Sequence, residues 1–117
     1  MTPQESKSLF LNLTISKRHT NLHVLDVSTQ KKVSIRDAGL IPALQPLISY
    51  MKKHGESKES ELSYFDSKRR RLRRWKVRSF SLFLSNIELL RLLPEKPVGK
   101  LKELRELSLI EKDEKTR

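Results

Sequence analysis

Strict alternation of apolar and polar side chains from Leu9 to Ser16 (LFLNLTIS) is the feature that most narrows the fold of this chain. Successive strand residues point to opposite faces, so this pattern predicts a half-buried β-strand. The polar residues 17–20 predict a turn, and residues 21–27 predict the returning strand. A second polar turn and a short strand at 32–36 complete a predicted antiparallel meander of three strands.

The apolar spacing becomes helical after Gly39. Apolar residues three and four positions apart predict an amphipathic helix over 40–54, with Gly55 as its C-terminal cap. Pro46 indicates that the regular helix begins only after the first few of these residues. Residues 56–67 are polar and charged, and we interpret them as an insertion or mobile loop.

The second half of the chain predicts one further strand and two helices. Residues 77–84 alternate like a strand, and the Ser-x-x-Glu spacing at 85–88 is typical of a capped helix start. The order β-β-β-α-β-α predicts an α/β domain over residues 1–93 with a mixed, ribonuclease-H-like sheet. Residues 94–117 are expected to form a linker and an appended helix, the helix covering 100–111.

The positive charge of the chain is concentrated in one short segment. The formal net charge is +11, and eight of the 25 Lys and Arg residues lie in residues 68–78 (KRRRLRRWKVR), which contain no acid. Like charges at this density repel one another, so the segment favours a polyanion as its neighbour. Leu72, Trp75 and Val77 interrupt the run and indicate that part of it is anchored to the folded body. Residues 56–78 are therefore a candidate basic insertion for nucleic acid, the alternatives being a solvated loop or a localisation signal.

The chain lacks the patterns of catalytic and metal-binding proteins. It has no cysteine, no phosphate-binding glycine loop and no nucleophile motif. Its three histidines, His19, His23 and His54, have too few neighbouring carboxylates to predict a metal site. No apolar run reaches the ~20 residues that a membrane-spanning helix needs. We therefore expect no enzyme activity, cofactor, metal, small-molecule substrate or membrane.

The first predicted hairpin resembles that of a ribosomal protein family. Leu13 to Asp26 (LTISKRHTNLHVLD) is similar to the first hairpin of the eleventh small-subunit ribosomal protein family, which has an apolar strand, a polar turn, an alternating strand and then Asp. Residues 33–39 (VSIRDAG) resemble the third strand of that family. Residues 44–55 resemble its long helix and 77–84 the strand that follows.

A second family shares part of this pattern. The eighteenth large-subunit ribosomal protein family, which binds the five-S ribosomal RNA, has a similar strand that leads to an Asp. Ser16, Arg18, His19 and Asp26 fit that pattern as well. The two resemblances imply a structural protein of either the small or the large ribosomal subunit.

The first resemblance implies a constituent of the small-subunit platform that binds ribosomal RNA. We expect it in a mitochondrial ribosome, or alternatively in the cytoplasm, beside neighbouring ribosomal proteins that contact helix 100–111. The N-terminus shows neither a secretory signal nor a recognisable presequence. The candidate RNA-binding residues are those of the first turn, the third strand and the basic run: Lys17, Arg18, His19, Thr20, Lys31, Lys32, Arg36, Lys68, Arg69, Arg70, Arg71, Arg73, Arg74, Trp75, Lys76 and Arg78.

Two other classes of protein remain open. A DNA-binding or regulatory module needs a helix with exposed base-reading side chains, whereas residues 40–54 are mainly apolar with basic residues at one end. A protein-interaction scaffold would use residues 100–111, and its binding should survive high salt.

Overall fold

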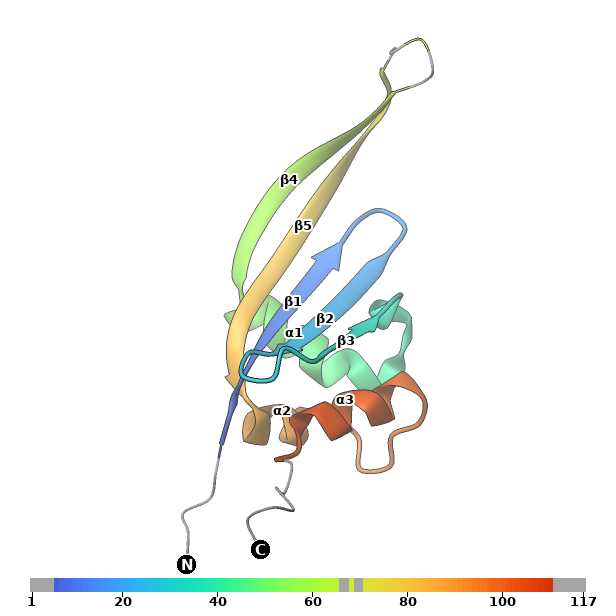
Figure 1. Ribbon diagram of the computed structural model, residues 1–117. Coiled ribbons are helices and arrows are strands. Elements are labelled where there is room, and N and C mark those ends of the chain that lie inside the picture. The colour runs from blue at the N-terminus through green and yellow to red at the C-terminus, as the bar shows by residue number, and fades with distance from the viewer. Residues whose placement is uncertain (1–5, 66–67, 69–70, 111–117) are drawn as a thin grey trace, which may run out of the picture.

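A five-stranded sheet organises the part of the chain that the structure describes, residues 6–65, 68 and 71–110 of a computed structural model (Figure 1). The spatial order is β3-β2-β1-β5-β4, and every neighbouring pair is antiparallel. The strands are β1 (Ser8–Ile15), β2 (Thr20–Asp26), β3 (Lys32–Ile35), β4 (Glu56–Phe65) and β5 (Arg71–Ser85).

The predicted α/β character is correct, but the predicted mixed sheet is wrong. The strand after the first α-helix is β4 at residues 56–65, where the sequence indicated a loop. A hairpin then returns the chain as β5, so that β5 runs antiparallel to β1. Because β4 is an additional strand, the strand that lies beside β1 runs in the opposite direction to the one that the sequence predicted. The ribonuclease-H-like arrangement is therefore not confirmed.

The first three strands lie next to one another in the sheet, as the two short turns between them require. In β1, Leu9, Leu11 and Leu13 are fully buried, and Leu22 and Val24 of β2 continue the same apolar face. The intervening side chains lie on the opposite face of the sheet. The alternation of the sequence thus translates directly into one buried and one open face.

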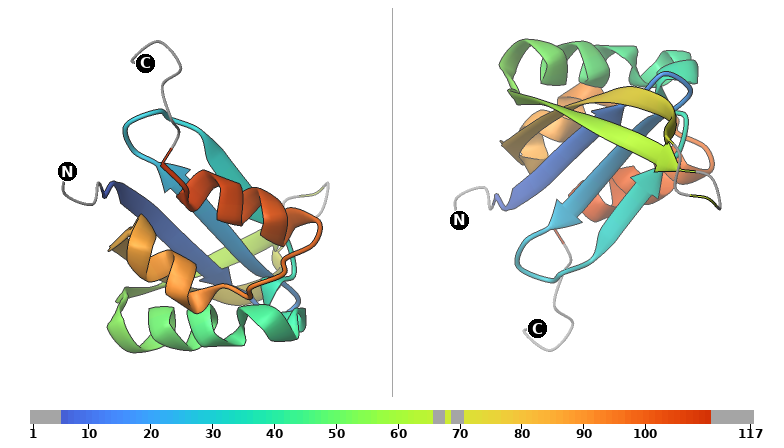
Figure 2. Two further views of the ribbon diagram at one scale, coloured as in Figure 1. Left: turned by 90° about the horizontal axis from the view of Figure 1, so that it is seen from below. Right: turned by 90° about the horizontal axis from the view of Figure 1, so that it is seen from above.

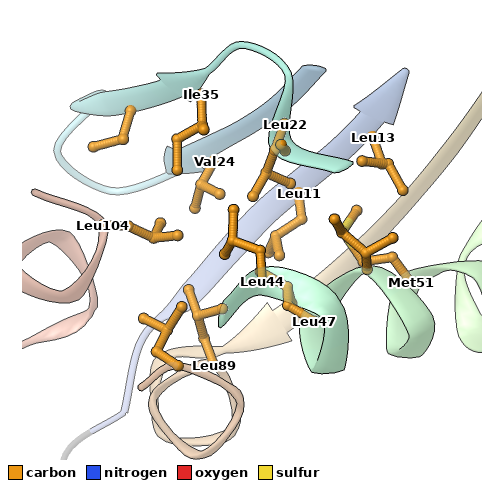
Figure 3. Close-up of a cluster of buried hydrophobic side chains, with 14 of the residues drawn as sticks. Leu11, Leu13, Leu22, Val24, Ile35, Leu44, Leu47, Met51, Leu89 and Leu104 are labelled. Atoms are coloured by element: carbon orange, nitrogen blue, oxygen red, sulfur yellow. The ribbon is translucent and has the colours of Figure 1, made fainter. Parts of the chain in front are cut away.

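Three α-helices pack on the buried face of the sheet: α1 (Gln45–His54), α2 (Asn86–Leu92) and α3 (Lys100–Ser108) (Figure 2). Figure 3 shows Leu47 of α1, Leu89 of α2 and Leu104 of α3 directed into one cluster with Leu11. All four side chains are fully buried. Burial of a leucine side chain stabilises a fold by about 1.5–3 kcal/mol.

The last helix is not an appendage. Leu101, Leu104 and Leu107 of α3 are buried in the common core, so the stretch expected to be a linker and extension completes the domain. The polar network around Asn86 explains how this end is held. Asn86 Oδ1 accepts from the backbone amide of Lys7 at 2.9 Å, and its Nδ2 donates to the Ser108 carbonyl at 2.9 Å. One buried amide thus joins both ends of the described chain to the start of α2.

The predicted helix over 40–54 is regular only in its second part. Two short 3₁₀ turns, η1 (Ala38–Leu40) and η2 (Pro42–Leu44), precede α1, and Pro46 lies in its first turn. Proline fits there because it has no amide hydrogen to donate. The predicted start of α2 is confirmed, because Ser85 Oγ accepts from the Glu88 amide at 3.2 Å.

Gly55 caps α1 by allowing a close approach rather than by adopting a left-handed conformation. Its φ of −73° is accessible to any residue, and its amide donates to the Met51 carbonyl at 2.8 Å. A Cβ at this position would lie 2.5 Å from that carbonyl oxygen and 3.2 Å from Cβ of Phe80. Glycine therefore lets the chain turn from α1 into β4 against β5.

Candidate nucleic-acid interface

The hairpin of β4 and β5 extends well beyond the other strands (Figure 1). The last residue of β1, Ile15, pairs with Arg78, so residues 71–77 of β5 pair with β4 alone. At about 3.4 Å per residue, this two-stranded arm projects roughly 20 Å past the end of β1. Most of the basic run predicted to bind nucleic acid is therefore part of a β-arm.

The charges of the arm are unevenly distributed along its length. At its base, residues 56–61 of β4 carry three glutamates and one lysine, and the facing residues 76–81 of β5 carry two cations, so the base is neutral. Arg78 Nη2 donates to Glu59 Oε2 at 3.1 Å, and Glu61 stands opposite Lys76 in the strand register. Beyond this point, residues 62–75 contain six cations and one acid. The net charge of +5 is thus concentrated in the distal arm.

The structure describes the predicted residues of the distal arm to different extents. Lys68 is exposed in the turn at the tip. The backbones of Arg71, Arg73 and Arg74 pair with residues 63–65 of β4. Arg69 and Arg70 lie outside the described residues. The register of the strands therefore places the described part of the basic run along one continuous projecting element.

The turn between β1 and β2 lies beside the root of this arm. Ser16 and His19 close the turn through a backbone hydrogen bond of 2.8 Å, with Lys17 and Arg18 exposed at its tip. The guanidinium carbon of Arg18 lies 5.5 Å from the centre of the Trp75 ring. A guanidinium over an indole face is an attractive cation–π arrangement. The two candidate regions that the sequence identified separately are therefore adjacent.

Arg36 joins the same end of the sheet. His19 Nδ1 lies 3.1 Å from Asp37 Oδ1, and Arg36 Nη2 lies 3.5 Å from His19 Nε2. Thr20 begins β2 directly after this turn. The structure thus brings the predicted residues of the first turn and Arg36, which follows β3, to the end of the sheet from which the arm projects.

Lys31 and Lys32 lie at the other end of the sheet. They follow the β2–β3 turn and line a pocket of about 400 Å³ together with Glu103 and Glu106 of α3. Lys7 and Asp26 also line this pocket, so its lysines and acidic residues balance. These two lysines are separated from the arm by the length of β2, so they do not lie beside Arg36 and the other candidate residues of the first turn.

Asp26 has a structural role at that distant end. Its carboxylate is buried, and Oδ2 accepts from Lys7 Nζ at 2.8 Å, while Oδ1 accepts from the amide and hydroxyl of Ser28 at 3.0 and 2.9 Å. Burial alone raises the pKa of a carboxyl group, but these hydrogen bonds outweigh it and hold the pKa of Asp26 far below its usual range. The aspartate that ends the resemblance motif therefore fixes the β2–β3 turn.

Sequence reasoning missed the partner strand of the basic run. The polar segment 56–61 (ESKESE) shows no apolar face, because each of its residues is exposed in β4, a strand at the edge of the sheet. The charge pattern of this segment could have indicated the hairpin, because the acids at 59 and 61 face the cations at 78 and 76 across it. The sequence also gave no indication of Gln45 and Lys52, which lie on the same face of α1 near the first turn.

The described residues contain no group of three or more His, Cys, Asp or Glu side chains that could hold a metal ion. His23, one of the histidines considered for such a role, has its Nδ1 2.8 Å from Ser34 Oγ on the open face of the sheet. None of the helices in the described part of the chain has the length and apolar character that crossing a membrane requires.

No protein-family model matches this chain, and searches of curated proteins and of solved structures give no match.

Proposed function

We propose that this chain is a structural RNA-binding protein, and that its ligand is ribosomal RNA. The distal arm inserts between RNA segments, and the turn with Lys17 and Arg18 contacts phosphates and 2′-hydroxyls at the root of the arm. Arginine forks suit phosphate oxygens, and such contacts fix position without reading sequence. The proposal places the chain in the small ribosomal subunit, as the resemblance of residues 13–26 implies, and in a mitochondrial ribosome, with the cytoplasm as the alternative.

The separation of charge along the arm carries this proposal. A solvated basic loop has no need of a long, ordered support, whereas the distal +5 segment is held away from a charge-neutral base. Projection of this charge places cations where a concave, negatively charged surface can surround them. Folded RNA provides such surfaces because its phosphates line deep, narrow grooves.

Duplex DNA is a poorer ligand for this geometry. The apolar side of α1 is buried against the sheet, with Leu47, Ile48 and Met51 all in the core. The basic residues of α1, Lys52, Lys53 and His54, lie only in its last turn. α1 therefore does not present a row of base-reading side chains for a major groove.

Contacts with neighbouring ribosomal proteins would use the outer face of α3. Its apolar residues Leu101, Leu104 and Leu107 are taken up by the core. Its exposed residues Lys102, Glu103 and Glu106 offer a charged surface. Salt-sensitive contacts therefore fit this helix better than the salt-resistant binding expected of an apolar scaffold.

The test compares RNA binding by two variants of equal net charge. In the first, glutamine replaces the five arginines of the distal arm: Arg69, Arg70, Arg71, Arg73 and Arg74. In the matched control, glutamine replaces five basic residues outside the arm: Lys53, Arg91, Lys96, Lys100 and Lys102. Fluorescence anisotropy with a structured fragment of small-subunit ribosomal RNA is measured against salt concentration.

We expect the arm variant to lose binding and the control variant to retain it. The logarithm of the association constant should fall with the logarithm of salt concentration, with a slope of about −0.7 to −0.9 per phosphate neutralised. The arm variant should show a distinctly shallower slope. Equal loss in both variants would show that total charge, and not the arm, drives binding.

Sedimentation of tagged protein in gradients of organelle and cytoplasmic extracts then identifies the particle. Association with small subunits supports the first resemblance. Association with large subunits supports the alternative, a protein that binds the five-S ribosomal RNA. Binding to RNA in vitro without association with either subunit would identify a non-ribosomal RNA-binding module.

A further inference from the structure

A pocket of about 370 Å³ lies between the β1–β2 turn, η1 and α1, close to the root of the arm. Small-molecule and cofactor sites commonly occupy about 300–1,000 Å³. The two walls come from distant parts of the sequence: the turn from the first hairpin, and Gln45, Ile48 and Lys52 from one face of α1. These three helix residues share that face because they are spaced three and four positions apart.

The pocket combines an apolar floor with a cationic rim. Ile48 is buried and Ile15 is half-buried, and both line it. Lys17, Arg18 and Lys52 line it as well and are exposed. An aromatic ring fits an apolar floor, and a phosphate fits the surrounding cations, so the pocket has the two chemistries of a nucleotide.

The single acid that lines the pocket is engaged elsewhere. Asp37 Oδ1 lies 3.1 Å from Nδ1 of His19, and His19 does not line the pocket. Polar groups are also in place for a base edge or a ribose. Gln45 Nε2 donates to the Gly39 carbonyl at 3.0 Å, which fixes the side chain, and Thr20 lines the wall beside it.

The contrast with the pocket near Lys31 strengthens this interpretation. That pocket has equal numbers of lysines and acidic residues in its lining, whereas the three cations here face one acid. Arg18 belongs both to this lining and to the contact with Trp75 of the arm. A strand of RNA that follows the arm towards the sheet therefore meets the pocket directly.

We propose that this pocket receives one unpaired nucleotide of the RNA that the arm binds. Its base lies on Ile15 and Ile48, and its phosphate lies between Lys17 and Lys52. The inference rests on the proposed function and adds to it a preference for RNA with an extruded base. Such a base is available at bulges and loops, where no pairing has to be broken.

The test uses two RNA hairpins of the same stem. One is fully paired, and the other carries a single bulged 2-aminopurine nucleotide. Binding is measured for the unaltered protein, for Lys52→Ala and for Lys53→Ala. The last is the matched control, because both lysines are exposed in the last turn of α1 and only Lys52 lines the pocket.

We expect the unaltered protein and Lys53→Ala to prefer the bulged hairpin and to change its 2-aminopurine fluorescence. Loss of one charge-assisted contact lowers an affinity by about tenfold, so the affinity of Lys52→Ala for the bulged hairpin should be lower by about that factor. The fully paired hairpin should bind Lys52→Ala and Lys53→Ala equally. Free adenosine monophosphate at high concentration should remove the preference without releasing the fully paired hairpin.

Three results would overturn the inference. Equal affinity for both hairpins would show that the pocket does not receive the bulged nucleotide, while the arm would remain an RNA-binding element. Equal effects of Lys52→Ala and Lys53→Ala on the bulged hairpin would show only the influence of charge. Tighter binding of free adenosine monophosphate than of the bulged hairpin would make a free nucleotide the ligand. Failure of both hairpins to bind would instead contradict the proposed function itself.

Discussion

Arg18 stands over Trp75, with its guanidinium carbon 5.5 Å from the centre of the indole ring. This contact joins the turn after β1 to Trp75, the residue of the distal arm that lies next to its base. The two residues are far apart in the sequence, but the pairing of β1 with β5 brings them together. The arm and the turn are consequently held in a defined relative position before any ligand binds.

The first prediction concerns the coupling of these two residues. Arg18→Ala and Trp75→Leu are made singly and together, and unfolding in urea is measured for each. A cation–π pair at an exposed site contributes about 0.5–1 kcal/mol, so the double variant should be less destabilised than the sum of the single variants by that amount. Lys17→Ala in the same turn serves as the control and should show no coupling to Trp75→Leu.

The second prediction concerns the neutral base of the arm. Glu59→Gln removes the partner of Arg78 and adds one positive charge to the net charge of the arm. RNA affinity should therefore rise severalfold at low salt, in contrast to the loss expected of most substitutions at an interface. Glu106→Gln, which changes the charge equally on α3, should leave RNA affinity almost unchanged in the same anisotropy measurement. A fall in affinity for Glu59→Gln would show that this ion pair helps the arm to bind.

The third prediction concerns Asp26 and pH. The pKa of its carboxyl is lower in the folded than in the unfolded protein, so its ionised form stabilises the fold. This contribution is complete above the unfolded pKa, near 3.9, and is lost as the pH falls below it towards the folded pKa. Urea denaturation of the unaltered protein and of Asp26→Asn should therefore differ most at pH 5–6 and converge towards about pH 2. A constant difference across this range would contradict the assignment.

The fourth prediction concerns the place of α3 in the core. Leu104 is fully buried, whereas Leu109, just beyond the same helix, is 41% exposed. Leu104→Ala should lower the free energy of unfolding by about 2–5 kcal/mol, because it leaves a cavity in the shared core. Leu109→Ala should lower it by less than about 1 kcal/mol. If the two variants unfolded at the same urea concentration, α3 would be the appendage that the sequence indicated.

The sequence by itself determined the local structure wherever the signal lies in residues close together in the chain. Alternation from Leu9 to Ser16 predicts β1 because the strand has one buried and one solvated face. The serine and glutamate at 85 and 88 predict the start of α2 because capping is satisfied within a few residues. The concentration of charge at 68–78 was also visible in the sequence alone.

Only the tertiary structure decided how these elements combine. The segment 56–65 becomes a strand because β5 supplies its hydrogen-bond partners, and its polar sequence carries no periodic signal of that pairing. Its presence makes the sheet antiparallel, aligns Glu59 with Arg78, and moves the effective positive charge to the distal arm. The packing of α1 on the sheet likewise brings Lys52 to the β1–β2 turn, which is distant from it in the sequence. Contacts between residues distant in sequence depend on the complete fold, so local composition cannot specify them.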